Sequence, residues 1–122
     1  MSVKIVVADD HEVVRTGLAT LLAGSDIKIV AEASSGPEAV KMAVKHKPDV
    51  VLLDIGMPKL NGYDACRKIR NQPQGANMLI CALTGWGQEE DKRRSRDAGF
   101  DHHLTKPPEP DVLERLIMSC AG

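Results

Sequence analysis

The sequence predicts a doubly wound α/β sandwich in which five βα units form a parallel sheet covered by helices. Five short strand-like runs, rich in Val, Ile, Leu and Ala, alternate with segments whose apolar residues recur at helical spacing. The strand-like runs are mostly apolar, which is typical of strands covered on both faces. Strands that alternate with helices in this way favour a parallel sheet with helices on both sides.

The expected elements follow one another at regular intervals along the chain. Pro37 suits the first turn of the second helix, which Ser35 or Gly36 can cap. The first helix carries four apolar residues on one face, namely Val14, Leu18, Leu21 and Leu22. Strands are expected at 3–8, 27–33, 50–54, 78–83 and 101–105, and helices at 12–23, within 34–48, near 63–71, near 88–97 and at about 110–120.

Length and composition indicate one globular domain that spans residues 1–122. A chain of 122 residues is long enough for one domain with a core and too short for two ordinary ones. The net charge of -1 gives no general attraction to nucleic acid or to an anionic membrane surface. No apolar run approaches the ~20 residues of a membrane-spanning helix. The N-terminus turns acidic too early for a signal peptide, so we expect a cytoplasmic protein.

The cysteine content indicates reduced thiols. Cys66, Cys81 and Cys120 are an odd number and have no CxxC spacing. We therefore expect each of them to be a small apolar filler.

Polar side chains stand at the carboxyl ends of the expected strands. Asp9 and Asp10 end the first strand, Asp54 ends the third, Thr84 ends the fourth, and Lys106 follows the fifth. The carboxyl ends of parallel strands meet at one edge of the sheet, where such folds bind ligands. In the strand order 2-1-3-4-5 the first and third strands are neighbours, so three carboxylates are expected to lie together.

This set of side chains suits a divalent cation and a phosphoryl group. Three close carboxylates repel one another unless a cation neutralises them, and oxygen ligands favour Mg²⁺ over zinc. The Lys106 ammonium and the Thr84 hydroxyl supply what phosphoryl oxygens need. Asp54 could then be the nucleophile that receives the phosphoryl group.

Each of these residues also has a purely structural interpretation. An Asp after a strand more often caps a turn than does chemistry, and Asp9 can cap the helix that begins near Glu12. Thr84 alone suits a strand, and Lys106 alone suits a solvated surface. His11 is expected at the rim of the site, where a structural role is favoured. Convergence on one edge favours function for the set as a whole.

Four motifs together carry a family resemblance. "VVADDHE", "DVVLLDIGMPKLNGYD", "ALTG" and "KPP" occur in this order at the ends of successive strands. The chain resembles the receiver domain of two-component response regulators over essentially its whole length. The resemblance implies a flavodoxin-like (βα)5 fold with a five-stranded sheet in the order 2-1-3-4-5.

The resemblance also implies a phosphoacceptor and a set of metal ligands. Asp54 would accept the phosphoryl group. Asp10 would bind Mg²⁺ directly, and Asp9 would help through water. The backbone carbonyl of Gly56 would be a further protein ligand, together with the acceptor Asp54.

The remaining implied roles concern the bound phosphoryl group, and three positions depart from the commonest pattern. Lys106 would pair with the phosphoryl oxygens, and Thr84 would hydrogen-bond the attached group. Gly56 offers only backbone where many relatives have a longer polar side chain. Trp86 is a large apolar residue two positions after Thr84. His103 stands where an aromatic residue usually acts as the conformational switch.

The expected function is therefore that of a phosphorylation switch and not of an enzyme acting on other substrates. The phosphoryl donor would be a sensor histidine kinase or a phosphotransfer protein. An output partner would contact the face formed by the fourth helix, fifth strand and fifth helix, without direct nucleic-acid binding by this domain. A stand-alone receiver and a piece of a longer chain both remain open.

Two other classes of function fit the sequence less well. A phosphohydrolase with an aspartyl nucleophile would normally need a second acid two positions later, where this chain has Gly56. An interaction module that no longer takes phosphate would not need the intact set of Asp10, Asp54, Thr84 and Lys106.

Overall fold

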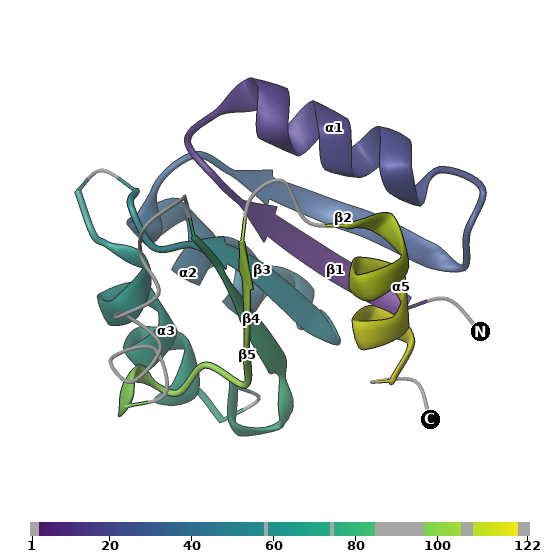
Figure 1. The fold of residues 1–122 in the computed structure, drawn as a ribbon. Helices are drawn as coiled ribbons and strands as arrows, with labels where there is room; N and C mark the ends of the chain where they lie inside the picture. The colour runs from purple at the N-terminus through teal and green to yellow at the C-terminus, as the bar shows by residue number, and fades with distance from the viewer. Residues whose placement is uncertain (1–2, 58, 74, 85–96, 106–108, 120–122) are drawn as a thin grey trace.

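A five-stranded parallel sheet lies between two layers of helices (Figure 1). The computed structural model describes residues 3–57, 59–73, 75–84, 97–105 and 109–119. The strand order is β2-β1-β3-β4-β5, which confirms the predicted order 2-1-3-4-5. The strands β1 and β3 are therefore neighbours, as the predicted site requires.

The helices and strands begin and end close to their predicted positions. The strands are β1 (Val3–Ala8), β2 (Ile27–Ala33), β3 (Val50–Asp54), β4 (Leu79–Thr84) and β5 (His102–Thr105). The helices are α1 (Glu12–Leu22), α2 (Gly36–His46), α3 (Gly62–Arg70) and α5 (Pro110–Ser119), with a short 3-10 helix at Gly75–Asn77. Most of the helix predicted near 88–97 lies outside the described residues.

Side-chain alternation along the strands produces two hydrophobic cores, one on each side of the sheet. Val6 and Leu53 belong to the core that is covered by α2 and α3. Ile5 and Leu52 belong to the core that is covered by α1 and α5. Every residue of β3 is buried, so the central strand has no solvent-facing side and ends with Asp54 inside the molecule.

Two local predictions for the helices have different outcomes. Ser35 caps α2, since its side chain accepts the backbone N–H of Glu38, and the Glu38 carboxylate accepts the N–H of Ser34 at 2.7 Å. Leu21 was predicted on the apolar face of α1 but is 42% exposed. At the helical spacing of 3.6 residues per turn, Leu18 and Leu22 take the buried positions, and Leu21 lies beside them.

The two described cysteines are buried and form no disulfide, as predicted. Burial raises the pKa of the Cys66 thiol to about 11, against a smaller opposing effect of the Arg70 cation. Cys66 is therefore a protonated thiol near neutral pH. Among the residues that the structure describes, no helix is long and apolar enough to cross a membrane.

Arg70 fixes the start of β5 to α3. Its guanidinium donates to the carbonyl oxygens of Gly99, Gly75 and Met78 and pairs with the Asp101 carboxylate at 2.6 Å. The side chain is 19% exposed, so these bonds are mostly shielded from water. This contact holds the segment that leads into β5 in a defined place.

Gly62 lets the first turn of α3 pack against the backbone that follows Asp54. Its N–H donates to the carbonyl of Ile55 at 3.1 Å. A Cβ at this position would lie 2.5 Å from the Ile55 Cα and 2.6 Å from the Asp54 carbonyl oxygen. The absence of a side chain therefore helps to fix the end of β3.

Replacement of this glycine should destabilise the protein. We expect Gly62→Ala to lower the free energy of unfolding by about 1–3 kcal/mol, because the added methyl group meets backbone that cannot move freely. Urea denaturation monitored by circular dichroism measures this change.

Gly17→Ala is the matched control, because Gly17 lies exposed in α1 with open space around its position. That variant should gain about 0.5–1 kcal/mol from helix propensity. A Gly62→Ala protein as stable as the wild type would contradict the assigned packing.

Candidate functional site

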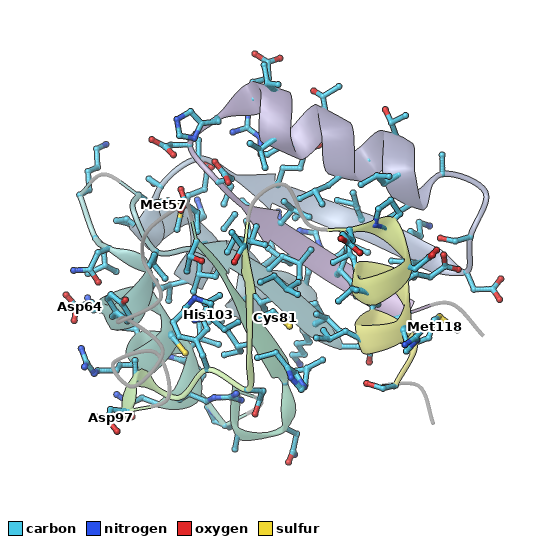
Figure 2. The ribbon with its side chains drawn as sticks, in the orientation of Figure 1. Met57, Asp64, Cys81, Asp97, His103 and Met118 are labelled. Atoms are coloured by element: carbon cyan, nitrogen blue, oxygen red, sulfur yellow. The ribbon has the colours of Figure 1, made fainter. Side chains whose placement is uncertain are left out.

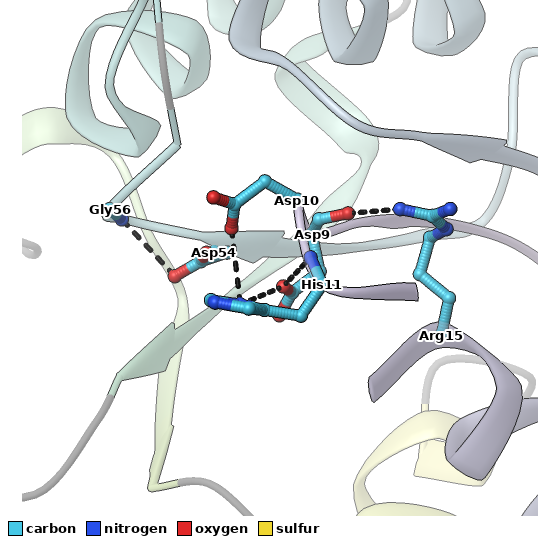
Figure 3. Close-up of polar contacts among 6 residues, drawn as sticks. All are labelled: Asp9, Asp10, His11, Arg15, Asp54 and Gly56. Carbon is cyan, nitrogen blue, oxygen red and sulfur yellow. Dashed lines mark hydrogen bonds and ion pairs between the residues drawn. The ribbon is translucent and has the colours of Figure 1, made fainter. Parts of the chain in front are cut away.

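Three carboxylates and one imidazole lie together at the carboxyl end of the sheet (Figure 3). Asp9 and Asp10 follow β1, and Asp54 ends the neighbouring strand β3. One ligand atom each from Asp9, Asp10, His11 and Asp54 lies within 4.8 Å of the others. The structure thus brings together the three predicted carboxylates.

The three carboxylates differ in their access to water. Asp9 is fully buried, and Asp54 is 5% exposed. The Asp10 side chain is 33% exposed. An ion at this cluster would therefore have protein on one side and room for water on the side of Asp10.

Asp9 is held by the chain turn that precedes α1. Its backbone N–H donates to the Ala33 carbonyl at 2.9 Å, and its Oδ1 accepts the backbone N–H of His11 at 2.9 Å. The N-cap residue of α1 is His11, whose side chain makes no capping hydrogen bond. Asp9 is therefore not the N-cap of α1. Its side chain orders the turn before the helix and lies in the acid cluster.

Asp54 is oriented by the loop that follows it. Its Oδ1 accepts the backbone N–H of Gly56 at 3.1 Å. A Cβ at Gly56 would only reach ordinary contact with this oxygen, at 3.8 Å. The loop therefore has room for a side chain at residue 56.

The sequence interpretation underestimated His11. Its Nδ1 lies 3.1 Å from Oδ1 of Asp9 and 3.2 Å from Oδ1 of Asp10, although the side chain is 65% exposed. Only the direct succession Asp-Asp-His pointed to this arrangement in the sequence. An imidazole therefore belongs to the acid cluster itself.

Arg15 is a second residue that sequence reasoning missed. Its Nη1 donates to the backbone carbonyl of Asp9 at 2.6 Å, and its Nε donates to Glu32 in β2 at 3.0 Å. The side chain is 17% exposed. Arg15 thus fixes the peptide between Asp9 and Asp10 from the side opposite to the site, as Figure 3 shows.

Thr84 and His103 link the site edge to β5. Thr84 ends β4 and is 2% exposed, and its hydroxyl donates to the Leu104 carbonyl at 3.3 Å. The Nε2 atom of His103 lies 3.0 Å from the same hydroxyl oxygen. His103, which is labelled in Figure 2, is partly buried, whereas its neighbour His102 is exposed, as expected for successive residues of a strand.

Two residues of the predicted site cannot be placed. Lys106 and Trp86 lie outside the described residues. Their assigned roles therefore stay predictions from the sequence.

A family model confirms the class of protein that this fold and site define. The model for the response regulator receiver domain matches residues 5–118. The chain belongs to the response regulator receiver domain family.

Curated relatives agree with this assignment. The chain is 34% identical to the nitrate/nitrite response regulator NarL of Escherichia coli strain K12, over 97% of this chain and 55% of the relative. It is 36% identical to the response regulator VraR of Staphylococcus aureus strain NCTC 8325, over 87% of this chain and 50% of the relative. The chain therefore spans about half the length of these relatives.

Solved structures agree as well. The receiver domain of a sensor histidine kinase from Pseudomonas aeruginosa, with a magnesium ion coordinated in its active-site cleft, superposes with a TM-score of 0.88 at 28% identity and covers 100% of both chains. A LuxR-family two-component response regulator from Aurantimonas gives a TM-score of 0.88 at 30% identity, over 100% of this chain and 87% of the other.

The contact between Thr84 and His103 leads to a prediction about the imidazole. A hydroxyl has one hydrogen, and Thr84 donates it to Leu104. The oxygen of Thr84 is then an acceptor for His103, so we expect a neutral His103 ring to carry its hydrogen on Nε2. Long-range ¹⁵N–¹H correlation NMR distinguishes the two tautomers.

Thr84→Val tests the same contact by stability. The variant should lose about 1–3 kcal/mol of unfolding free energy, because the Leu104 carbonyl loses a buried donor. Thr105→Val is the control, since Thr105 pairs with Thr84 across the strands but is exposed, and it should stay within about 0.5 kcal/mol. Equal effects of both substitutions, or hydrogen on Nδ1 of His103, would contradict the assigned hydrogen bonds.

Proposed function

We propose that Asp54 accepts a phosphoryl group from the phosphohistidine of a sensor histidine kinase or phosphotransfer protein, with Mg²⁺ as the cofactor. The observation that carries this proposal is the position of the Asp54 carboxylate. It is nearly buried at the end of β3 and lies within 4.8 Å of ligand atoms of Asp9 and Asp10. In the receiver family, such an acid cluster is the expected phosphorylation site.

The donor set fits Mg²⁺. Asp10 and Asp54 would be direct ligands, Asp9 would act through water, and the backbone carbonyl of Gly56 would complete the protein ligands. Magnesium favours oxygen ligands and keeps several waters, and the partial exposure of Asp10 leaves space for them. When bound, Mg²⁺ supplies positive charge for the carboxylates and for the phosphoryl oxygens.

Residues of this chain position the Asp54 carboxylate and the incoming phosphoryl group. A carboxylate oxygen of Asp54 attacks phosphorus in line, so an O–P bond forms while the P–N bond to the donor imidazole breaks. The hydrogen bond from the Gly56 backbone restricts the orientation of this carboxylate. Lys106 pairs with the phosphoryl oxygens in this proposal. Hydrolysis of the acyl phosphate on Asp54 returns the domain to its initial state.

The signal would pass through Thr84 and His103. Thr84 turns its hydroxyl towards the attached phosphoryl group and thereby gives up its bond to Leu104. Its contact with His103, at 3.0 Å, couples this movement to β5. The imidazole thus serves where an aromatic switch residue is usual in the family.

An output partner or an attached domain would recognise the face formed by the helix expected near 88–97, β5 and α5. Val112 and Met118 of α5 are apolar and 43% and 36% exposed, which supports a contact surface on this helix. The transcriptional regulators among the relatives are about twice as long as this chain. We therefore assign any nucleic-acid binding to a region outside this domain.

Phosphorylation of a single carboxylate tests the proposal. With a small acyl-phosphate donor and Mg²⁺, the wild type should gain one phosphoryl group, and Asp54→Asn should gain none, because an amide is no nucleophile here. Intact-mass spectrometry counts the adducts.

Asp64→Asn is the matched control. Asp64 is a 48% exposed carboxylate in α3 that pairs with Arg67, away from the acid cluster. This variant should be phosphorylated as the wild type is. Equal labelling of the Asp54→Asn protein would overturn the assignment.

A further inference from the structure

We infer that His11 determines which divalent cation the acid cluster favours. Its imidazole competes with Mg²⁺ for the carboxylates of Asp9 and Asp10, and it becomes a ligand when the ion is a transition metal such as Zn²⁺. This inference rests on the proposed cation site and adds a residue outside the oxygen-only ligand set.

The position of the ring carries the inference. Nδ1 of His11 is nearly equidistant from one oxygen of Asp9 and one oxygen of Asp10, at 3.1 and 3.2 Å. The backbone N–H of His11 also bonds to the same Asp9 oxygen at 2.9 Å, which holds the residue at the cluster. In Figure 3 the ring lies against both carboxylates.

These separations suit two different uses of the same nitrogen. They match an N–H donor shared between two carboxylate oxygens. They also match the edge of a coordination shell, because two ligands about 2.0–2.1 Å from one ion are about 3.0 Å apart in an octahedron and about 3.3 Å apart in a tetrahedron. The imidazole can therefore donate to the acids or join them around an ion with little movement.

Cation chemistry decides between these two uses. Magnesium selects oxygen ligands, so it competes with the imidazole donor for the Asp10 carboxylate, which it binds directly, and for the Asp9 carboxylate, which it reaches through water. Zinc accepts imidazole nitrogen together with carboxylate oxygen. For that ion His11 binds through Nδ1 as the neutral tautomer with hydrogen on Nε2, and the 65% exposed side chain leaves the ring in contact with water.

A purely structural role for His11 gives a different expectation. His11 is the N-cap residue of α1. If it served only to order this turn, its removal would weaken the binding of every cation alike. Opposite effects on Mg²⁺ and Zn²⁺ therefore separate the cation-selecting role from the structural one.

Calorimetric titration of the intact domain with Mg²⁺ and with Zn²⁺ tests the inference. His11→Asn should bind Mg²⁺ roughly fivefold more tightly, the scale of one competing hydrogen bond. It should bind Zn²⁺ at least about tenfold more weakly, because even the loss of an outer-shell partner of a metal ligand costs about tenfold to a hundredfold. Asn is a good N-cap residue, so α1 should form normally in this variant.

His102→Asn is the matched control, because His102 is an exposed histidine on β5. The His102→Asn protein should bind Mg²⁺ and Zn²⁺ with the same affinities as the wild type. Proton NMR of the Co²⁺ form gives a direct reading of ligation, with a strongly shifted imidazole N–H signal that persists in His102→Asn and is absent from His11→Asn. Affinity changes of the same sign for both cations, no change in either, or a shifted signal retained in His11→Asn would overturn the inference.

Asp10→Asn separates this inference from the proposed site. If that variant loses affinity for both ions while His11→Asn affects them equally, the acid cluster binds cations and only the role of His11 is wrong. If Asp10→Asn leaves both affinities unchanged, the cation site and the inference fail together.

Discussion

Asp9, Asp10 and Asp54 hold three carboxylates close together, and the repulsion among them must be offset by the fold or by a cation. Two like charges about 5 Å apart repel by ~3 kcal/mol at an effective dielectric constant of ~20. The fold holds three such groups within this range, and two of them are almost excluded from water. The arrangement persists because neighbouring elements fix the backbone that carries the acids, and it makes the cluster a strong attractor for positive charge.

The supports of this cluster come from several parts of the chain. Gly62 brings α3 against the end of β3, and Arg15 binds the carbonyl of Asp9 from α1. Donor groups of His11 and Gly56 reach individual carboxylate oxygens. These contacts orient the carboxylates at one edge of the sheet, and a cluster of three carboxylates suits a cation and a group that binds together with one.

The edge of the sheet also offers a route from the site to the surface. Thr84 and His103 lie in contact across β4 and β5, and Arg70 anchors the segment that leads into β5. In the proposed switch, this one hydroxyl group would carry a change at the site to β5, while the contacts of Arg70 hold the start of that strand.

Sequence reasoning predicted the parts of this account that follow from local patterns. The apolar runs placed each strand of the sheet, and the position of Asp54 after β3 located the site, because parallel strands share one carboxyl edge. Sequence reasoning missed the contacts of His11 and Arg15, because these contacts depend on the geometry of the connection between β1 and α1 and not on residue spacing. The bond between Thr84 and His103 depends in the same way on the register of β4 and β5. Leu21 shows that helical spacing alone does not fix the limits of a buried face.

The repulsion can be measured from the unfolding free energies of the wild type and Asp54→Asn, each without divalent cations and with saturating Mg²⁺. The repulsion predicts that Asp54→Asn is the more stable protein in a chelator, because one of three like charges is gone. Saturating Mg²⁺ should then raise the unfolding free energy of the wild type by more than that of the variant, since binding stabilises the folded state in proportion to affinity. A variant that is less stable without cations, together with an equal Mg²⁺ effect on both proteins, would show that repulsion among the three carboxylates does not govern this site.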